Sequence, residues 1–265
     1  MSVLDPAAYV SLMDELTRIV AHAAETILDL AVKANVRTKA DGSPVTAADE
    51  AAEAVIRDGL QRLAPGITII SEERAADEKP NVPAGEDAGY FLVDPLDGTR
   101  EFIAGRDEYT VNIALVTEGG PVLGVICAPA AGDIWRGIVG KGADRVSRAE
   151  IKRSTKIHTR PRPAREAVIM VSRSHLEART RAYVEGFAQA KQVQCGSSVK
   201  FCRVAEGSAD VYPRLAPTHD WDIAAGHAIV KAAGGNVTAP DGSPLRYGTA
   251  ELLIPAFVAS GDATA

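Results

Sequence analysis

The stretch Tyr90-Phe91-Leu92-Val93-Asp94-Pro95-Leu96-Asp97-Gly98-Thr99 decides how the rest of the chain is interpreted. The apolar run that opens it predicts a buried strand. Pro95 predicts a turn just past the strand end, because its ring fixes φ near about −65°. Asp94 and Asp97 then leave the strand tip, and Gly98-Thr99 opens an expected short helix, whose unpaired N–H groups suit a phosphate. Carboxylates beside an anion site need cations, and Mg²⁺ prefers oxygen ligands of this kind.

Residues 94–99 also allow two other interpretations. Asp, Pro and Gly mark polar turns by themselves, so a plain surface loop is one alternative. The second alternative is a phosphatase with an aspartate nucleophile, which needs another aspartate two residues later. The spacing from Asp94 to Asp97 is three residues, so we disfavour this second chemistry.

The composition is that of a globular protein and disfavours several functional classes. The chain has 265 residues, of which 46% are hydrophobic and 24% charged, enough for one large or two modest domains. A net charge of −6 argues against nucleic-acid polymers as partners and requires local attraction of any phosphate substrate. The three cysteines form no Cys-x-x-Cys pair, which indicates a reducing compartment and no zinc site.

The sequence also carries an expectation about location. We find no apolar signal-peptide region at the N-terminus and no run near the ~20 apolar residues of a membrane span. We therefore expect a cytoplasmic protein, and leave open a peripheral association with the inner face of the cell membrane. The oligomeric state is not predicted.

Two capped helices are predicted in the first quarter of the chain. Asp5-Pro6 is an N-cap followed by proline at the first helical position, before a long amphipathic helix. Thr46 is a good N-cap for a second helix that ends near Leu63. Asp49, three residues after this cap, is either the acid of a capping box or a carboxylate aimed into a metal site.

Several strands are predicted before residue 140. A strand over residues 67–70 is followed by Glu72, as the next strand is followed by Asp94, so the two carboxylates share a sheet edge if these strands are neighbours. Residues 74–89 predict an exposed loop or flap. The segments 110–116, 122–127 and 134–139, joined by Gly-containing turns, predict an antiparallel meander.

The chain is expected to divide at a basic, proline-containing segment, residues 145–165, interpreted as a solvated connection. Residues 1–150 are then an N-terminal α+β domain with an antiparallel sheet and most of the candidate metal ligands. Residues 151–265 alternate strands and helices, which predicts a C-terminal α/β domain. Asp222 falls in the first turn of a helix predicted over residues 218–233, where the helix dipole favours an acid in any case.

Five acids lie at the ends of predicted elements: Asp49, Glu72, Asp94, Asp97 and Asp222. Each has an ordinary explanation when taken singly. Two unit charges ~5 Å apart at an effective dielectric of ~20 repel by about 3 kcal/mol, so five converging acids would need two or three divalent ions. Failure of the acids to converge would exclude the site.

Four motifs, in order, resemble a known family: Pro44-Val45-Thr46-x-x-Asp49, Ser71-Glu72-Glu73, Asp94-Pro95-Leu96-Asp97-Gly98-Thr99 and Trp221-Asp222-x-x-Ala225-Gly226. From about Lys39 to the end, the chain resembles the inositol monophosphatase superfamily of magnesium-dependent, lithium-sensitive phosphatases. The resemblance implies an α/β fold, a layered α-β-α-β-α sandwich whose C-terminal domain has a mixed sheet. It also implies two to three Mg²⁺ ions.

The resemblance implies a role for each site residue. One Mg²⁺ is held by Glu72, Asp94 and the Leu96 carbonyl, a second by Asp94, Asp97 and Asp222, and a third, weaker one by Glu72 with Asp49 nearby. Asp49, Thr99 and Glu72 are the implied catalytic residues, and Thr99, oriented by Asp49, positions the attacking water. The implied substrate contacts are Glu72, Leu96, Asp97, Gly98, Thr99, His175, Ser197, Lys200, Arg214 and Asp222.

A finer resemblance, carried by Ser172-Arg173-Ser174-His175, Gly196-Ser197-Ser198 and Tyr212-Pro213-Arg214, is to the bacterial 3'(2'),5'-bisphosphate nucleotidase branch of sulfate assimilation. It implies hydrolysis of the 3'-phosphate of adenosine 3',5'-bisphosphate to AMP and phosphate. The substrate's second phosphate needs basic partners, and Lys200 and Arg214 are suitable.

Two alternatives remain beside this expectation. The same site could hydrolyse inositol monophosphate or fructose 1,6-bisphosphate. A non-enzymatic nucleotide or metal sensor is disfavoured, because Thr99 and all the candidate metal acids are present. Lys200 has a simpler alternative, an exposed lysine on a helix.

Overall fold

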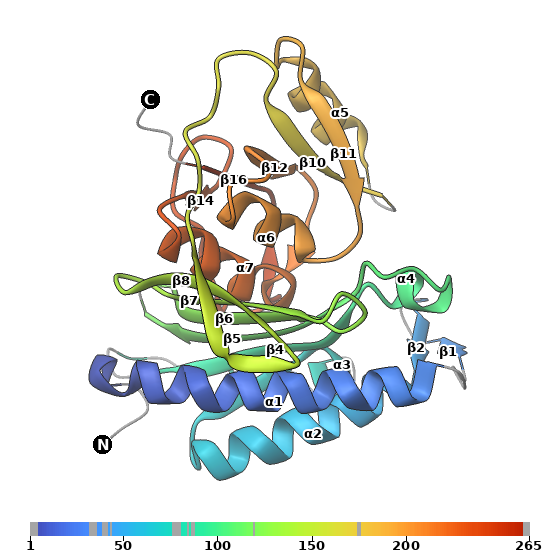
Figure 1. The fold of residues 1–265 in the computed structure, drawn as a ribbon, viewed down its shortest axis with the longest axis vertical. Coiled ribbons are helices and arrows are strands. Elements are labelled where there is room, and N and C mark those ends of the chain that lie inside the picture. Colours follow the sequence, from blue (N-terminus) through green and yellow to red (C-terminus); the bar gives the residue numbers. More distant parts are fainter. Residues whose placement is uncertain are drawn as a thin grey trace.

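Five layers alternate helices and sheets in the computed structural model, which describes residues 5–31, 36–38, 42, 44–75, 81–83, 85, 88–118, 120–173 and 176–261. Figure 1 shows the order from bottom to top: helices α1 and α2, a seven-stranded sheet, helices α6 and α7, a five-stranded sheet, and helix α5. The α-β-α-β-α sandwich implied by the resemblance is confirmed.

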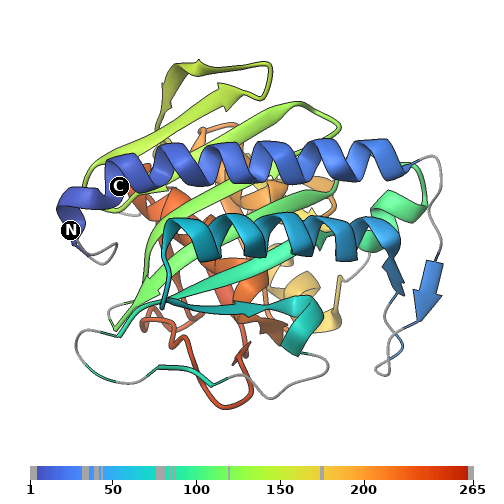
Figure 2. The ribbon, with the colours of Figure 1, turned by 90° about the horizontal axis from the view of Figure 1, so that it is seen from below.

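Both predicted caps start a helix, although Asp5 caps the short helix η1 (Pro6–Ala8) and α1 (Tyr9–Leu30) itself follows Ala8 without a side-chain cap. Asp5 accepts a hydrogen bond from the N–H of Ala7 at 2.9 Å, and η1 leads into α1. Thr46 starts α2 (Ala47–Leu63). The two helices lie side by side across one face of the seven-stranded sheet (Figure 2), and their apolar faces make a core with it.

The first sheet has the strand order β3-β4-β5-β6-β7-β8-β9, and β4 to β9 run antiparallel. Strands β3 and β4 are parallel neighbours, and the predicted meander is confirmed as β5-β6-β7. The strands are β3 (Thr68–Ser71), β4 (Tyr90–Asp97), β5 (Thr110–Thr117), β6 (Gly120–Ala128), β7 (Asp133–Ile138), β8 (Gly142–Ser147) and β9 (Glu150–Ile157). A separate pair joins β1 (Val36–Thr38) to β2 (Pro44–Thr46).

The prediction of a solvated connection over residues 145–165 was wrong for more than half of its length. Strands β8 and β9 form a hairpin there, and β9 is the edge of the first sheet. Most residues of β9 are exposed. Charged side chains suit an edge strand because they discourage pairing with other chains. In the sequence, such a run of exposed charged residues resembles a loop. Because the first sheet ends at Ile157, we propose that the two domains divide after this residue rather than at residue 150.

The second sheet is mixed, as expected, with the order β11-β10-β12-β16-β14. Strand β10 is parallel to β11 and β12, and β16 is antiparallel to both of its neighbours. The elements of this half are β10 (Val168–Ser172), α5 (Ala178–Glu185), β11 (Lys191–Cys195), α6 (Val199–Ala205), β12 (Val211–Arg214), β13 (Thr218–His219), α7 (Asp220–Ala232), β14 (Asn236–Thr238), β15 (Leu253–Ile254) and β16 (Phe257–Ser260). Helix α7 begins two residues later than predicted, because Thr218 and His219 pair with β15.

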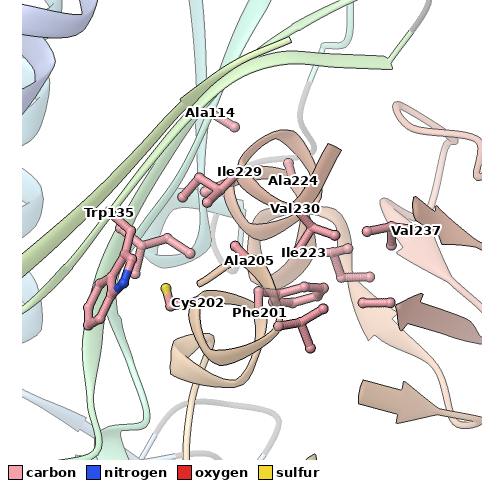
Figure 3. Close-up of a cluster of buried hydrophobic side chains, with 14 of the residues drawn as sticks. Ala114, Trp135, Phe201, Cys202, Ala205, Ile223, Ala224, Ile229, Val230 and Val237 are labelled. Atoms are coloured by element: carbon pink, nitrogen blue, oxygen red, sulfur yellow. The ribbon is translucent and has the colours of Figure 1, made fainter. Parts of the chain in front are cut away.

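Helices α6 and α7 fill the space between the two sheets (Figure 3). Phe201 and Ile229 belong to the same buried cluster as Trp135 of the first sheet and Val237 of the second. Helix α7 lies unusually close to the first sheet, because a Cβ built on Gly124 would be 2.3 Å from the Ala225 carbonyl oxygen. This packing brings the N-terminus of α7 to the end of strand β4. No helix in the described parts of the chain is long and apolar enough to cross a membrane.

Candidate active site

A cavity of about 270 Å³ lies where the two halves of the molecule meet. Both halves supply its walls, which include Glu72, Asp94, Leu96, Asp97, Gly98, Thr99, Ser197, Lys200, Arg214 and Asp222. The predicted site residue Asp49 lies behind Thr99 and contacts it. His175, the remaining predicted contact, falls outside the described residues. Of the five acids in the sequence argument, Glu72, Asp94, Asp97 and Asp222 therefore converge on this cavity, and Asp49 is joined to it only through Thr99.

The shared sheet edge predicted for Glu72 and Asp94 is present. Ser71 of β3 pairs with Val93 of β4, so the two acids follow paired positions of parallel strands. The sequence predicted that the second of these strands ends before Asp94. In the structure β4 continues to Asp97. Its register with β5 shifts between Asp94 and Asp97, and both carboxylates line the cavity around this irregularity.

Asp94, Asp97 and Asp222 can each offer one oxygen to a common ion, because these oxygens lie within 4.8 Å of one another. The protein holds one oxygen of each carboxylate. The N–H of Leu96 donates to Asp94 Oδ1 at 3.1 Å, and the N–H of Ser198 donates to Asp97 Oδ2 at 2.6 Å. Asp222 Oδ2 accepts from the hydroxyl of Thr218 at 2.5 Å and from the N–H of His219 at 3.1 Å. Within the described chain, the buried Asp94 Oδ2 has no hydrogen-bond partner.

The electrostatics of this cluster favour a bound cation. Burial, followed by the charges of Glu72, Asp97 and Asp222, raises the pKa of Asp94 well above its usual value. Burial and the charge of Asp222 raise the pKa of Asp97 to about 7. Metal-free protein would therefore retain protons in the cluster near neutral pH, whereas a divalent ion would replace them and offset the repulsion. The carboxylate set and the unpartnered oxygen fit such an ion.

The capping-box interpretation of Asp49 is confirmed, whereas its carboxylate neither lines the cavity nor belongs to the cluster of Asp94, Asp97 and Asp222. Asp49 is 1% exposed, and its Oδ2 accepts from the N–H of Thr46 at 2.8 Å and from the Thr46 hydroxyl at 2.6 Å, which completes the capping box. Its Oδ1 accepts from the Thr99 hydroxyl at 3.0 Å. A structural cap thus also orients a residue of the cavity. Asp222 is likewise a helix cap and, unlike Asp49, is a member of the acidic cluster.

The second half contributes two cationic side chains, Lys200 and Arg214, which differ in their hydrogen-bond partners. Lys200 is only 3% exposed, which contradicts the alternative of an exposed helix lysine. Its Nζ donates to the carbonyl of Cys195 at 3.2 Å and to that of Ser197, and lies 5.0 Å from the centre of the Tyr212 ring. Arg214 also lines the cavity, and its buried Nε has no partner among the residues described. Arg214 therefore keeps a donor that the described chain does not use.

Ser198 is the functional residue that the sequence did not reveal. Besides its N–H bond to Asp97, its hydroxyl lies 2.7 Å from Asn112 Oδ1 and 2.7 Å from the Thr110 hydroxyl. Ser198 belongs to a motif of the finer resemblance, but no spacing pattern relates it to Asp97, which is 101 residues away.

Comparison with known proteins agrees with this geometry. Residues 8–264 match the inositol monophosphatase family. The chain is 41% identical over 251 residues to the Escherichia coli O157:H7 protein named 3'(2'),5'-bisphosphate nucleotidase CysQ, covering 93% of this chain and 98% of that relative. The Haemophilus influenzae protein of the same name is 33% identical over 234 residues, covering 86% and 84% of the two chains.

Solved structures lead to the same family. The structure of CysQ from Bacteroides thetaiotaomicron, a bacterial member of the inositol monophosphatase family, has a TM-score of 0.81 and 34% identity, covering 95% of this chain and 97% of that one. An inositol monophosphatase from Zymomonas mobilis has a TM-score of 0.75 and 26% identity, with 97% and 94% covered. The sequence match, the shared fold and the converging acids lead to one conclusion: this chain belongs to the inositol monophosphatase family.

Proposed function

We propose that this protein is a magnesium-dependent 3'(2'),5'-bisphosphate nucleotidase. Its reaction is the removal of the 3'-phosphate from adenosine 3',5'-bisphosphate, which gives AMP and inorganic phosphate. The observation that carries the proposal is the convergence of Asp94, Asp97 and Asp222 in one cavity that also contains Thr99 and Arg214. Relatives about 41% identical over nearly the whole chain, which are named as such nucleotidases, support the substrate.

Two to three Mg²⁺ ions complete the proposed site. Asp94, Glu72 and the Leu96 carbonyl would hold one, and Asp94, Asp97 and Asp222 a second. Glu72, with Asp49 nearby, would support the third. Divalent ions at such a site lower the pKa of a bound water and stabilise charge on the leaving oxygen.

Thr99 and Asp49 orient the attacking water. The Thr99 hydroxyl has two acceptors, Asp49 Oδ1 at 3.0 Å and the Leu96 carbonyl at 3.2 Å. When it donates its single hydrogen to Asp49, its oxygen can accept a hydrogen from water. As the water attacks phosphorus and the bond from phosphorus to the 3'-oxygen breaks, the proton of the water passes to Thr99 Oγ1 while the threonine proton moves to Asp49 Oδ1. The leaving 3'-oxygen takes a proton from solvent and becomes the 3'-hydroxyl of AMP. Burial raises the pKa of Asp49, which suits it to accept this proton. The backbone N–H groups of Gly98 and Thr99 bind the phosphate that is cleaved.

The second phosphate of the substrate is bound by the C-terminal half. Arg214 supplies a guanidinium with an unpartnered Nε, and arginine can donate two parallel hydrogen bonds to phosphate. Lys200 contributes its charge and its remaining hydrogen, since its Nζ already donates to two carbonyls. A substrate with one phosphate, such as inositol 1-phosphate, would leave Arg214 without its anion.

Side-by-side turnover of three substrates tests the proposal. We expect adenosine 3',5'-bisphosphate to be hydrolysed with a higher kcat/KM than inositol 1-phosphate or fructose 1,6-bisphosphate. Equal cleavage of inositol 1-phosphate would contradict the substrate assignment. A protein that binds the nucleotide but releases no phosphate from any of the three would be a sensor, and the enzyme proposal would fail.

We also place the enzyme in the cytoplasm. All three cysteines are free and buried, which fits a reducing compartment. The alternative of association with the inner face of the cell membrane finds no support in the described part of the molecule.

A further inference from the structure

Two loops of the cavity meet at one residue outside it, Glu108. Gly98, at the end of the β4 loop, is so close to the Glu108 carbonyl oxygen that an added Cβ would lie 3.0 Å from it. Gly196, in the loop between β11 and α6, is closer still, with a Cβ at 2.8 Å from the same oxygen. The backbone of Glu108 is thus packed between a loop of the first half and a loop of the second.

The side chain of Glu108 joins the halves by three hydrogen bonds. Arg173, just after β10, donates from Nε to Oε2 at 2.9 Å and from Nη2 to Oε1 at 2.6 Å. The N–H of Gly196 donates to Oε2 at 2.8 Å. Arg173 Nη2 also reaches the carbonyl of Gln194 at 3.2 Å. This bidentate pair therefore holds the ends of two neighbouring strands against the N-terminal half.

The loop that this pair holds goes directly to a candidate metal ligand. Ser197 has a φ of +43°, a left-handed conformation that a residue with a side chain keeps only when surrounding contacts impose it. The next residue, Ser198, donates its N–H to Asp97 Oδ2 at 2.6 Å. A single residue, Ser197, therefore separates the bond at Gly196 from the bond that orients Asp97.

We propose that Glu108 and Arg173 are positioning residues that fix Asp97 through the loop 196–198. Neither residue lines the cavity, so neither contacts the substrate or the ion directly. Breaking the pair leaves the acidic cluster and the bonds of the Ser198 hydroxyl to Asn112 and Thr110 in place, but it releases the loop at Gly196. The N–H of Ser198 is then held less firmly against Asp97 Oδ2. This inference rests on the proposed metal-dependent function and adds to it the residues that determine how tightly the metal is bound.

Metal binding to Arg173→Gln and Glu108→Gln tests this inference. Mn²⁺ binding to metal-free protein is measured by electron paramagnetic resonance, and the half-saturating Mg²⁺ concentration is measured during turnover. In both variants we expect the Mn²⁺ affinity to fall by roughly tenfold and the half-saturating Mg²⁺ concentration to rise by the same factor, which is the scale seen when a metal ligand loses its outer hydrogen-bond partners. We expect kcat at saturating Mg²⁺ to change much less. The double variant should be no worse than either single variant, and Arg173→Lys should recover part of the affinity.

Arg160→Gln is the matched control. Arg160 makes the same bidentate contact with Asp210, at 2.7 and 2.8 Å, and Asp210 likewise accepts a backbone N–H, from Val168 at 2.7 Å. This pair is not part of the cavity wall. We expect Arg160→Gln to lower the melting temperature with Mn²⁺ affinity unchanged.

The outcomes separate the two proposals. Equal Mn²⁺ affinity in wild type, Arg173→Gln and Glu108→Gln would overturn the positioning inference alone. A weakening as large in Arg160→Gln as in Arg173→Gln would also overturn it, because general loosening of the fold would then be the cause. A wild-type protein that binds no divalent ion would overturn the proposed function itself.

Discussion

Asp210 and Asp94 are both buried carboxylates, but the protein neutralises only one of them. Asp210 is 0% exposed; burial acts to raise its pKa, but the two hydrogen bonds from Arg160 and the N–H of Val168 outweigh burial and hold the pKa below its usual value. Asp94 is 1% exposed and has acids as its charged neighbours, and its pKa is strongly raised. The first site is complete within the chain, whereas the second is complete only with a cation.

The same contrast holds for the basic side chains. Arg160 has its carboxylate, but Arg214 keeps a buried Nε with no partner within the described residues. A folded chain normally pairs its buried polar atoms, so an unpartnered Asp94 oxygen and an unpartnered Arg214 nitrogen, on two residues that line one cavity, indicate ligands of both signs. Metal ions and a phosphorylated substrate are such ligands.

The largest difference between the acidic cluster and the Arg160–Asp210 pair should appear when one aspartate of each is changed to asparagine. Asp97→Asn removes a proposed metal ligand and part of the repulsion, so phosphate release should fall below about 1% of wild type while metal-free protein melts at an equal or higher temperature. Asp210→Asn should keep its activity but lose about 1–3 kcal/mol of stability, because Arg160 loses a charged partner. Near-normal activity of Asp97→Asn would contradict the metal assignment.

Thr99→Ala would leave Asp49, like Asp94, with a carboxylate oxygen that lacks a hydrogen-bond partner. Without the hydroxyl, Asp49 Oδ1 loses its partner, and the water loses its orienting group. We expect kcat to fall by roughly 10²-fold, the lower end for loss of acid–base positioning, with Mg²⁺ affinity nearly unchanged. Thr99→Ser keeps the hydroxyl and is the control. A fall in kcat that is equally large in both variants would show that shape, and not the hydroxyl, matters.

Arg214→Gln should affect substrate binding more than turnover. A lost charged hydrogen bond is worth about 1.5–3 kcal/mol, so KM for adenosine 3',5'-bisphosphate should rise by about 10–100-fold. The hydrolysis of a substrate with a single phosphate should change little. Steady-state kinetics on both substrates gives the answer, and an equal loss on both would show that Arg214 does not bind the second phosphate.

The smallest expected effect is a pH-dependent gain of stability with Mg²⁺. The pKa of Asp97 rises from about 4 in the unfolded chain to about 7 in the folded one. Metal-free protein therefore loses stability as the pH rises through this window, since the folded state keeps protons that the unfolded state has released. The increase in melting temperature caused by Mg²⁺ should be at least about 3 °C larger at pH 8 than at pH 5.5. An equal shift at both pH values would mean that the ion does not displace these protons.

Features set by neighbouring residues were predicted correctly from the sequence. The caps at Asp5 and Thr46 and the meander from β5 to β7 depend on bonds within or between adjacent elements. The hairpin of β8 and β9 was missed, because its basic edge strand does not alternate apolar and polar residues. The sequence left open whether Lys200 is buried, since its partners are backbone carbonyls that no residue type signals.

The amino-acid sequence by itself determined which acids are available, where each helix is capped and to which family the chain belongs. Only the tertiary structure decided which carboxylate oxygens are held by the protein and which one, Asp94 Oδ2, is left without a partner in the described chain. That choice depends on bonds such as the one from Ser198 to Asp97, across 101 residues, and on the close packing of α7 against Gly124. Contacts of this range arise from the packing of whole layers, so no local pattern of residues specifies them.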